Sequence, residues 1–547
     1  MRVLIVGGVA GGATTATRLR RLDEKAEIII FERGQYVSFA NCGLPYYIGN
    51  VIKEKIALLL QTPKSFKNRF NIDVRINQEV IKIDRDNKTI LIKNTEDGSE
   101  YTEKYDKLVL SPGAEPINPF KNLNSSKIAT IRNVDDSIRV KEYIQKNRPQ
   151  NIAIIGGGYI GVEVAENIKK YSDTNVTIIE KSDHLIAPLD KDIASILHNT
   201  LRKNNINIIL NNGVNKIEEN NNEFNILLDN GMINADYIIL AIGVKPETKL
   251  AKEANIEINL KGSIITDEHM RTNDPNIYAL GDAVQIKNCI TKCSDYIPLA
   301  GPANRQARIV ANNICGIASS YSGTIGSSIL KVFDYTLAMS GINENTCKRQ
   351  NINYKKMIIT PFSHATYYPG ATEMFVKALY SPDKKTLLGI QILGKENVDK
   401  VADVLATAIK CNLSIYDLEN LELCYAPPFS SAKSIPNILG NAIENEIKGL
   451  VENISWEDLE NLSTPYVLDA RTKREYETGH FENAINIPVD ELRENLDKLN
   501  KDNLIYVYCR TGVRSYISCR ILTQNGFHVK NILGGYNLYN EIKKDRL

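Results

Sequence analysis

The chain has 547 residues, of which 43% are hydrophobic and 24% charged, and its formal net charge is +2. This length predicts several domains, and the composition is typical of a globular protein. A net charge so close to zero argues against nucleic acid or an anionic membrane surface as a partner.

The sequence begins MRVLIVGG, a short apolar strand that enters a glycine turn without a preceding signal peptide. No apolar run approaches the roughly 20 residues that span a bilayer. Nine cysteines at irregular spacing indicate reduced thiols, so we expect a cytoplasmic protein without a membrane segment. Cys289 and Cys293 lack a matching second pair, and no metal site is expected.

The first predicted unit, within residues 3–33, is a strand, a glycine turn, a helix and a second strand that ends at Glu32. Two glycines of GGVAGG fit a dinucleotide-binding turn, although Val9 takes the middle glycine position. An acid about 20 residues after the turn is placed to bond ribose hydroxyls. The candidate cofactor-binding residues are Gly7, Gly8, Ala10, Gly11, Gly12, Glu32 and Arg33.

The second unit begins at residue 151 with NIAIIGGGYIGVEVAENI, which fits the complete GxGxxG pattern. Glu180 again ends the following strand, and an acid there favours NADH over NADPH. The adjacent Lys181 leaves NADPH open. The candidate residues are Gly156, Gly158, Tyr159, Ile160, Gly161 and Glu180.

A third motif, TNDPNIYALGDAV (residues 272–284), ends a strand at Gly281 and Asp282. It resembles the second flavin motif of two-dinucleotide flavoproteins, whose aspartate bonds the flavin ribityl chain. The segments LVLSPGAEP and IILAIGVKP resemble the crossovers between their FAD and NAD domains. On these motifs, the chain resembles the pyridine nucleotide-disulfide oxidoreductase family as far as about residue 445.

That resemblance implies bound FAD and a homodimer. It also implies a discontinuous FAD domain (1–145 and 246–325), an NAD(P)H domain (146–245) and an α+β dimerisation domain (326–445). A linker (446–455) and a C-terminal domain (456–547) would follow. The expected fold class is α/β, with two Rossmann-type domains.

The segment SFANCGLPYY (residues 38–47) holds Cys42, and the next cysteine is Cys289. In the family this segment lies against the flavin ring, which implies that Cys42 exchanges electrons with the flavin. No CxxxxC pair is present for an internal disulfide cycle. In the NADH oxidase and peroxidase branch a histidine in the first glycine turn assists a sulfenic acid, but Ala10 stands at that position here.

The segment closely resembles the motif of the coenzyme A-disulfide reductase branch. That resemblance implies a mixed disulfide between Cys42 and a thiol that arrives with the substrate, which reduced flavin then cleaves. We expect a lowered pKa for Cys42 beside the flavin, because the thiolate is the nucleophile. A buried structural thiol is the alternative.

Two later segments, FSHATYYPGA (362–371) and ELCYAPPFSSAKSIPNILG (422–440), resemble dimerisation-domain motifs of the same branch. They imply that Tyr367 and Tyr425 approach the cysteine from the other subunit, where a phenol can protonate a departing thiolate. Tyr368 could replace Tyr367, and ordinary aromatic packing is the alternative. The resemblance also implies coenzyme A binding by Arg18, Arg21, Ser38, Asn41 and Lys433. For the two arginines, a solvated basic helix face is the alternative.

Past residue 446 the pattern of short strands and helices restarts and predicts a separate α/β core. The motifs DxR at Asp469 and Arg471, GHxxxAxNIP from Gly479, and CRTGVR resemble a rhodanese domain. In the CRTGVR loop, backbone N–H groups and a helix start would stabilise a thiolate or persulfide on Cys509. Arg510 and Arg514 add positive charge. A phosphatase is the rival reading, but the six-residue span resembles sulfur-transferring rhodaneses.

Together these expectations predict an FAD-dependent NAD(P)H reductase of coenzyme A disulfide, coenzyme A persulfide or polysulfide, with Cys509 handling sulfane sulfur. One alternative is an NADH oxidase or peroxidase with an accessory sulfurtransferase domain. Another is a non-catalytic, sulfur-binding redox sensor. The remaining cysteines are expected to be structural.

Overall fold

The computed structural model describes residues 1–120, 123, 125–220 and 223–546. They form two compact units, residues 1–182 with 205–326, and residues 183–204 with 327–547. Within the described residues, no helix combines the length and apolar character that crossing a membrane requires.

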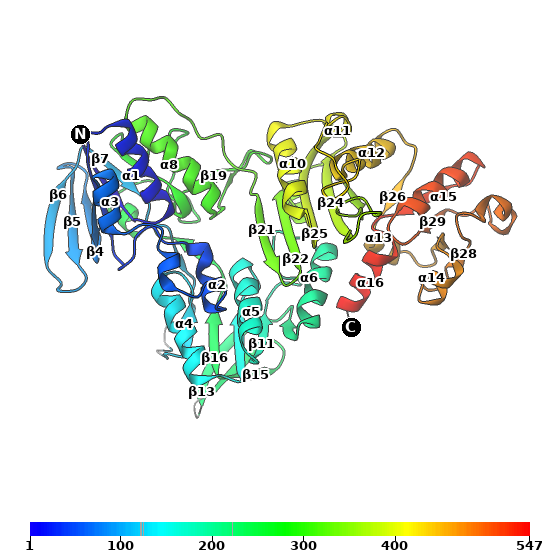
Figure 1. Ribbon diagram of the computed structural model, residues 1–547, viewed down its shortest axis with the longest axis horizontal. Helices are drawn as coiled ribbons and strands as arrows, with labels where there is room; N and C mark the ends of the chain where they lie inside the picture. The colour runs from blue at the N-terminus through cyan, green and yellow to red at the C-terminus, as the bar shows by residue number, and fades with distance from the viewer. Residues whose placement is uncertain (121–122, 124, 221–222, 547) are drawn as a thin grey trace. The chain divides into compact units, whose positions relative to one another are not determined.

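A five-stranded parallel sheet of order β18–β7–β1–β2–β3 begins the first unit. Its strands are β1 (Arg2–Val6), β2 (Glu27–Glu32), β3 (Asp73–Ile76), β7 (Lys107–Leu110) and β18 (Ile277–Ala279). The centre of β1 is fully buried, as expected for a parallel strand that is covered on both faces. Helices α1 (Ala10–Leu22) and α8 (Ala300–Ile314) pack side by side against this core (Figure 1).

A second parallel sheet has the order β12–β11–β10–β16–β9. Its strands are β9 (Ile128–Thr130), β10 (Asn151–Ile155), β11 (Asn175–Ile179), β12 (Ile206–Ile209) and β16 (Tyr237–Leu240), and its helices are α4 (Val134–Asn147) and α5 (Tyr159–Tyr171). The expected crossover segments form an antiparallel pair, β8 (Ala114–Pro116) with β17 (Val244–Pro246). Both Rossmann-type sheets of the prediction are therefore confirmed.

Smaller elements complete the first unit. Two antiparallel sheets contain β4 (Gln78–Asp84), β5 (Thr89–Asn94), β6 (Glu100–Lys104), and β13 (Val214–Asn220), β14 (Glu223–Leu228), β15 (Met232–Ala235). The others are η1 (Asn41–Gly43), α2 (Leu44–Ile48), η2 (Lys55–Leu58), α3 (Pro63–Phe70), α7 (Lys249–Glu253), η3 (Gly281–Ala283), β19 (Ile286–Lys287) and β20 (Ser294–Asp295).

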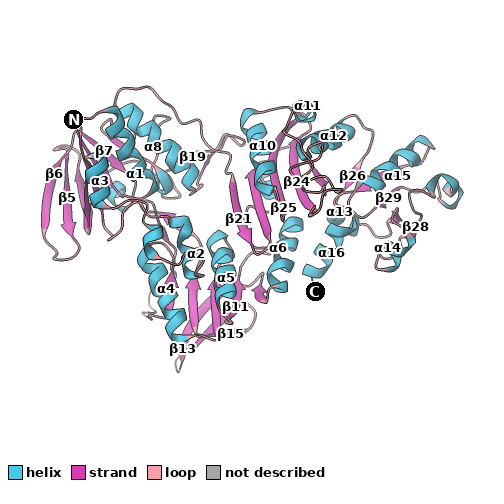
Figure 2. Ribbon diagram, viewed as in Figure 1, coloured by secondary structure: helices cyan, strands magenta, loops and turns pink. Residues whose placement is uncertain are grey.

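The second unit contains helix α6 (Lys191–Lys203) and an antiparallel sheet of order β21–β22–β25–β24–β23. The strands are β21 (Ser328–Val332), β22 (Tyr335–Gly341), β23 (Lys355–Ile359), β24 (Met374–Ser381) and β25 (Thr386–Gly394). The helices are α9 (Glu344–Arg349), α10 (Val398–Cys411), α11 (Ile415–Glu419) and α12 (Ile435–Ile447). Helix α10 contacts β22 and β25, and Figure 2 shows it beside β25.

The chain ends in a parallel sheet of order β26–β30–β29–β27–β28. Its strands are β26 (Asn453–Ile454), β27 (Tyr466–Asp469), β28 (Ile485–Asn486), β29 (Ile505–Tyr508) and β30 (Val529–Ile532). Its helices are α13 (Trp456–Glu460), α14 (Lys473–Glu477), η4 (Leu492–Glu494), η5 (Leu496–Lys498), α15 (Val513–Gln524) and α16 (Gly535–Asp545). Strand β26 pairs with β30, although it lies in the segment expected to be a linker.

A buried lysine joins distant segments of the second unit. Lys377, on β24, is 1% exposed, and its Nζ lies 2.8 Å from Asp192, 3.0 Å from Asp190 and 2.5 Å from Glu344. Among the described residues, these three acids form the one group of carboxylates close enough to hold a metal ion. The lysine ammonium is their counter-ion, so the cluster is an ion-pair network that links the start of α6 to the antiparallel sheet.

Candidate functional site

The first glycine turn joins β1 to α1 and leaves no room for side chains. Gly7 has a φ of +92°, and a Cβ there would lie 2.1 Å from the carbonyl oxygen of Ser111. A Cβ at Gly12 would lie 1.9 Å from the carbonyl oxygen of Gly7. The turn therefore requires both glycines, and it exposes the start of α1 at Ala10, where a pyrophosphate can approach the backbone.

Glu32, at the end of β2, stabilises this turn through hydrogen bonds. Its Oε2 accepts a hydrogen bond from the Gly8 N–H at 2.9 Å, and its Oε1 accepts one from the Gly34 N–H at 3.0 Å. Burial raises the pKa of Glu32, and these backbone bonds oppose the shift. Arg33 is exposed, and its Nη1 lies 3.6 Å from Glu247 Oε2. The carboxylate of Glu32 thus lies beside the glycine turn, as a ribose-binding acid must.

The second turn repeats this construction between β10 and α5. A Cβ at Gly156 would lie 2.4 Å from the carbonyl oxygen of Ala241, and one at Gly161 would lie 2.1 Å from that of Gly156. Glu180 Oε2 accepts a hydrogen bond from the Gly157 N–H at 2.7 Å. In both motifs, an acid at the end of the second strand accepts a hydrogen bond from the glycine turn.

The space at the second turn fits a bound pyrophosphate. Gly158 is the N-cap residue of α5, and a Cβ there would meet no protein atom within 4 Å. Tyr159 and the exposed Ile160 follow in the first turn of the helix. At the first turn the corresponding N-cap is Val9, while Gly11 is buried, and a Cβ there would lie 2.5 Å from Leu280.

The expected flavin motif lies close to the Cys42 segment. Asp282, in η3, has its Oδ2 3.6 Å from Arg132 Nη2. Oriented to satisfy both groups, the Asn41 amide donates to the Arg132 carbonyl oxygen at 2.9 Å and accepts from Nη1 at 3.2 Å. Burial raises the pKa of Asp282, and the charge of Arg132 opposes the shift. Arg132, which no sequence motif singled out, therefore links Asp282 to the residue beside Cys42.

In the protein by itself the pKa of Cys42 is raised, whereas the sequence predicts a lowered pKa beside the flavin. Cys42 lies in η1 and its side chain is accessible to solvent. Desolvation by the surrounding atoms nevertheless raises the pKa of the thiol, and the carboxylates of Glu163 and Asp282 raise it further. The sequence expectation considered the need for a thiolate but not these two negative charges.

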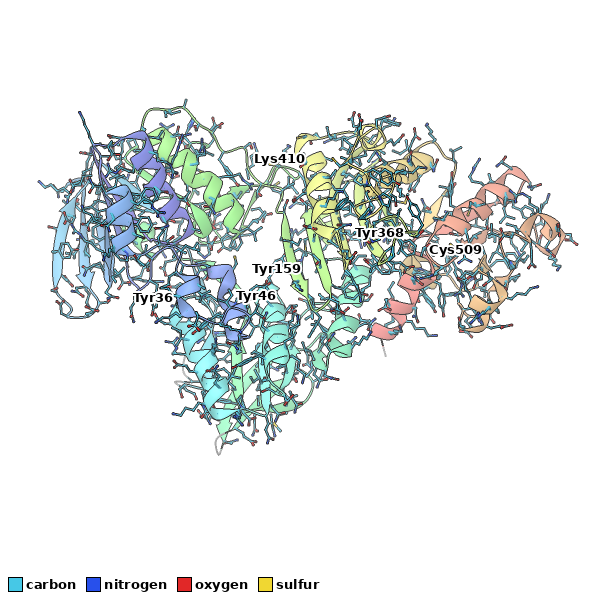
Figure 3. The ribbon with its side chains drawn as sticks, viewed as in Figure 1. Tyr36, Tyr46, Tyr159, Tyr368, Lys410 and Cys509 are labelled. Atoms are coloured by element: carbon cyan, nitrogen blue, oxygen red, sulfur yellow. The ribbon has the colours of Figure 1, made fainter. Side chains whose placement is uncertain are left out.

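Glu163 belongs to α5, just after the second glycine turn, and α5 packs against α2. The Tyr46 hydroxyl donates to Glu163 Oε1 at 3.4 Å, and Figure 3 labels Tyr46 and Tyr159 on these two helices. Burial raises the pKa of Glu163 to about 7. Cys42 thus lies where a carboxylate from each of two cofactor motifs acts on its sulfur.

The substrate-binding candidates on the first unit differ in their surroundings. Arg18 donates from Nε and Nη2 to Asn312 Oδ1 on α8, both at 3.1 Å, whereas Arg21 is exposed. Ser38 has a φ of +48°, uncommon outside glycine, and its N–H donates to the Gly8 carbonyl oxygen at 2.8 Å. Ser38 and Asn41 therefore lie beside the first glycine turn and Arg132, respectively.

Tyr367 and Tyr425 meet on the surface of the second unit. Their hydroxyl groups are 2.8 Å apart, and the side chains are 74% and 47% exposed. The hydrogen bond with Tyr425 raises the pKa of Tyr367. Tyr368 is also exposed, and its ring packs edge-on against His364. Lys433 is exposed and directly precedes Ser434, the N-cap of α12.

Cys509, labelled in Figure 3, directly follows β29 and is 1% exposed. Its Sγ accepts a hydrogen bond from the Gly512 N–H at 3.1 Å. Gly512 is the N-cap of α15 and has a φ of +121°, which favours glycine. The loop therefore turns sharply after the cysteine and directs a backbone donor and a helix start at its sulfur, as expected for an anion cradle.

Both arginines of this loop are paired with glutamates. Arg514 donates to Glu475 through two bonds of 2.7 Å, and this pairing lowers the pKa of Glu475 to about 2. Arg510 Nη2 donates to Glu373 Oε1 at 2.5 Å. Neither glutamate was among the sequence candidates, because each lies far from the CRTGVR motif in the chain.

Arg471 of the DxR motif is 3% exposed and supports the same domain. It donates to Asp469 with Nη2 at 2.6 Å, and its guanidinium lies 4.0 Å from the ring centre of Tyr536. The Tyr508 hydroxyl also donates to Asp469, at 2.6 Å. This buried network connects the strand before Cys509 to β27 and α16, and we assign it a structural role.

Three family models match the chain in succession. The pyridine nucleotide-disulphide oxidoreductase model matches residues 1–307, its dimerisation-domain model matches 327–434, and the rhodanese-like domain model matches 452–542.

Individual relatives agree with this order. The chain is 36% identical to the coenzyme A disulfide reductase of Staphylococcus epidermidis, over 80% of this chain and 99% of that one. It is similar to reduced Bacillus anthracis CoADR-RHD, with a TM-score of 0.97 and 44% identity over 100% of this chain and 98% of that chain. It is also similar to an NAD-dependent persulfide reductase from A. fulgidus, with a TM-score of 0.94 and 35% identity over 98% and 100% of the two chains.

Proposed function

The chain belongs to the pyridine nucleotide-disulphide oxidoreductase family, and we propose that it reduces coenzyme A disulfide, coenzyme A persulfide or polysulfide with electrons from NAD(P)H. The observation that carries this proposal is that Cys42 lies within electrostatic reach of Asp282, in the flavin motif, and of Glu163, in the helix after the second glycine turn. The relatives named for coenzyme A disulfide and persulfide reduction support the choice of substrate.

The residues present fit two dinucleotides. FAD would be held by the first glycine turn, Glu32 and Asp282, and NADH by the second turn and Glu180. The Glu180 carboxylate favours a nicotinamide cofactor with an unmodified ribose, although Lys181 is next to it. When bound, the flavin would supply the electron path from the nicotinamide to sulfur.

Cys42 supplies the nucleophile. In the proposed reaction its thiolate attacks one sulfur of the substrate, a new S–S bond forms, and coenzyme A leaves as a thiolate. For a persulfide substrate the departing group is hydrosulfide. No second cysteine accompanies Cys42 in its segment, so the thiol that completes the redox pair comes from the substrate.

Protonation of the leaving group is the role proposed for Tyr367 and Tyr425. Their hydroxyl groups already share one hydrogen bond, which leaves one of the two phenolic protons for a departing sulfur. Both side chains are exposed within one chain, which suits a role completed by a second subunit. The match of residues 327–434 to a dimerisation domain supports a homodimer, which we propose here.

Cys509 would carry sulfane sulfur as a persulfide. Its buried Sγ, the Gly512 N–H and the start of α15 together stabilise an anionic sulfur. The rhodanese-like match at residues 452–542 supports this role over that of a phosphatase. Sulfur loaded there would be the source of the persulfide that Cys42 reduces.

The decisive experiment measures NADH oxidation without oxygen, in the presence of coenzyme A disulfide, coenzyme A persulfide or polysulfide. We expect Cys42→Ser to abolish turnover with every substrate. Cys509→Ser should retain turnover of the two coenzyme A substrates and lose only the activity that starts from polysulfide. Cys411→Ser is the matched control, since Cys411 is exposed at the end of α10 and should change nothing.

A full rate in Cys42→Ser would contradict the proposal. So would NADH oxidation that needs only oxygen, which would identify an oxidase. The structure gives that alternative no support, because Ala10, the position of the assisting histidine, has no titratable side chain. A protein that turns over no disulfide at all would instead indicate a redox sensor.

A further inference from the structure

Glu373 connects the antiparallel sheet to the sulfur-carrying loop. It directly precedes β24, and its side chain is 20% exposed. Oε1 accepts a hydrogen bond from Arg510 Nη2 at 2.5 Å, while Oε2 accepts one from Asn537 Nδ2 at 2.9 Å. One carboxylate thus contacts both the Cys509 loop and the start of α16.

Glu373 also forms an ion pair with Arg510, the residue that directly follows Cys509. Arg514 is already neutralised by Glu475, and Arg510 by Glu373, so each arginine of the loop has a carboxylate partner. The guanidinium of Arg510 is half exposed and is the one nearest to solvent. Without a carboxylate partner, the Arg510 guanidinium would attract small anions strongly, because a guanidinium group binds oxyanions through two parallel N–H donors.

We propose that Glu373 determines which sulfur donors Cys509 accepts. By holding Arg510 in an ion pair, it withholds the cation that a small inorganic dianion such as thiosulfate needs. Donors with little charge near the sulfane sulfur, above all organic persulfides, do not need that cation and are favoured. The proposal rests on the sulfurtransferase half of the proposed function and makes Glu373 a positioning residue that acts through Arg510.

The step that Glu373 would tune is the loading of Cys509. The Cys509 thiolate forms a bond to the outer sulfur of the donor, and the bond between that sulfur and the donor breaks with its electron pair on the donor. An organic persulfide then leaves as a thiolate, and thiosulfate leaves as sulfite, a second dianion. Only the thiosulfate reaction brings and releases a doubly charged group at the loop, so only it should depend strongly on Arg510.

A cavity of about 530 Å³ adjoins the Glu373 side of the pair and is lined in part by Glu373 and Asn537. Lys544 and Lys395 also line it. Dissolved ions can therefore reach this region, and ionic strength should modulate the binding of an anionic donor.

The test is sulfur transfer from thiosulfate to cyanide by the full-length holoenzyme. Glu373→Gln keeps an oxygen for Asn537 but removes the charge that holds Arg510. We expect the KM for thiosulfate to fall about fivefold, the size of an exposed charge-pair effect, with a smaller change in kcat. The KM of the variant should also rise more steeply with added salt than that of the parent protein.

Two further variants show whether the effect runs through Arg510. Asn537→Ala removes the other contact of Glu373 and leaves the ion pair, so its KM should match that of the parent. In the double variant Glu373→Gln with Arg510→Gln, the fall in KM should disappear. A KM that is unchanged or raised in Glu373→Gln, an equal fall in Asn537→Ala, or a fall that survives in the double variant would each overturn the proposal.

Failure of the proposal can be separated from failure of the proposed function. Intact-mass measurement after exposure to polysulfide reports whether Cys509 gains one sulfur atom. If Cys509 is loaded but Glu373→Gln has the thiosulfate KM of the parent, the specificity role alone is wrong. If Cys509 never gains sulfur in either protein, the sulfurtransferase assignment and this proposal fail together.

Discussion

At the scale of single residues, the sulfur of Cys42 is governed by its electrostatic surroundings. Two carboxylates, Glu163 and Asp282, disfavour its thiolate, and no side chain with a resolved influence on this thiol favours it. The thiol of the protein itself is therefore held in its neutral form at neutral pH. Activation must come from a change in these charges, and Glu163 is suited to that because its pKa is raised to about 7.

This leads to a pH prediction. Below pH 7 Glu163 is mostly protonated and exerts little effect on Cys42, whereas above pH 7 its charge opposes thiolate formation. Glu163→Gln removes that charge, so alkylation of Cys42 should become faster above pH 7 and remain unchanged well below it. The rate of iodoacetamide labelling, followed by peptide mass spectrometry, measures this. Equal profiles for the two proteins would contradict the role of Glu163.

Arg20 shows how neighbouring residues of one helix can differ in function. It is 5% exposed and donates to five backbone carbonyl groups, those of Asp23, Glu24, Ala26, Phe70 and Asn71. The sequence candidates Arg18 and Arg21 flank this structural arginine in the same helix. Arg20 therefore fixes the end of α1 rather than binding substrate.

Arg20→Met should destabilise the protein by about 3 kcal/mol, because the carbonyl groups that Arg20 binds would be left without a hydrogen-bond donor. Arg21→Met is the matched control: Arg21 is exposed, and its loss should cost no more than about 0.5 kcal/mol. Urea unfolding monitored by circular dichroism measures both. Similar costs for the two variants would show that the carbonyl cluster is not a stabilising feature.

At the scale of elements, the second glycine turn separates stability from cofactor binding. A Cβ at Gly161 would clash with Gly156 of the protein, whereas a Cβ at Gly158 would meet no protein atom. Gly161→Ala should therefore lower the melting temperature. Gly158→Ala should keep it and instead raise the KM for NADH, since the added methyl group occupies the space of the expected pyrophosphate.

Thermal denaturation and NADH kinetics on the same two proteins test this distinction. If Gly158→Ala bound NADH as tightly as the parent, the pyrophosphate would have to bind elsewhere. If Gly161→Ala melted normally, the turn would have more freedom than its contacts indicate.

The parallel sheets, glycine turns and CRTGVR loop were predictable because each is encoded within a short stretch of sequence. The strand and turn around Gly156 follow from local apolar and glycine patterns, and the geometry of Cys509 follows from one six-residue motif. By contrast, Arg132, Glu163, Glu373 and Glu475 act on residues that lie far away in the chain, so no local pattern identifies them. The raised pKa of Cys42 was missed for the same reason.

At the scale of the whole molecule, the segment 183–204 belongs with the second unit although the following residue rejoins the first. Lys377 holds the start of α6 through Asp190 and Asp192, and it also binds Glu344. On α6 itself, the His198 ring contacts Asp545 of α16 at 2.9 Å. The C-terminal domain and the antiparallel sheet therefore share one helix as a common support.

Lys377→Met should destabilise the second unit by about 3–5 kcal/mol, because two buried carboxylates and one partly buried carboxylate would lose their common counter-ion. Lys395→Met, at a half-exposed lysine 3.7 Å from Asp334, is the control and should have little effect. Acid should also destabilise the second unit. Burial raises the pKa of Glu344, but Lys377 and Lys356 outweigh burial and lower this pKa to about 2. The contribution of Glu344 to stability is therefore lost as the pH falls from about 4.5 towards 2. Urea midpoints at pH 7 and pH 3 measure both effects.

The hydrogen bonds that Glu180 accepts limit how the preference for NADH over NADPH could be redesigned. A design for NADPH would first replace this acid. Its oxygens, however, also accept hydrogen bonds from the N–H groups of Gly157, at 2.7 Å, and Ser182, at 2.8 Å. Removing the Glu180 side chain would relieve its repulsion of a 2′-phosphate. It would also remove the hydrogen bonds that hold the glycine turn expected to bind the diphosphate. A successful exchange would have to keep a neutral acceptor at this position, such as glutamine, and place the new cation elsewhere.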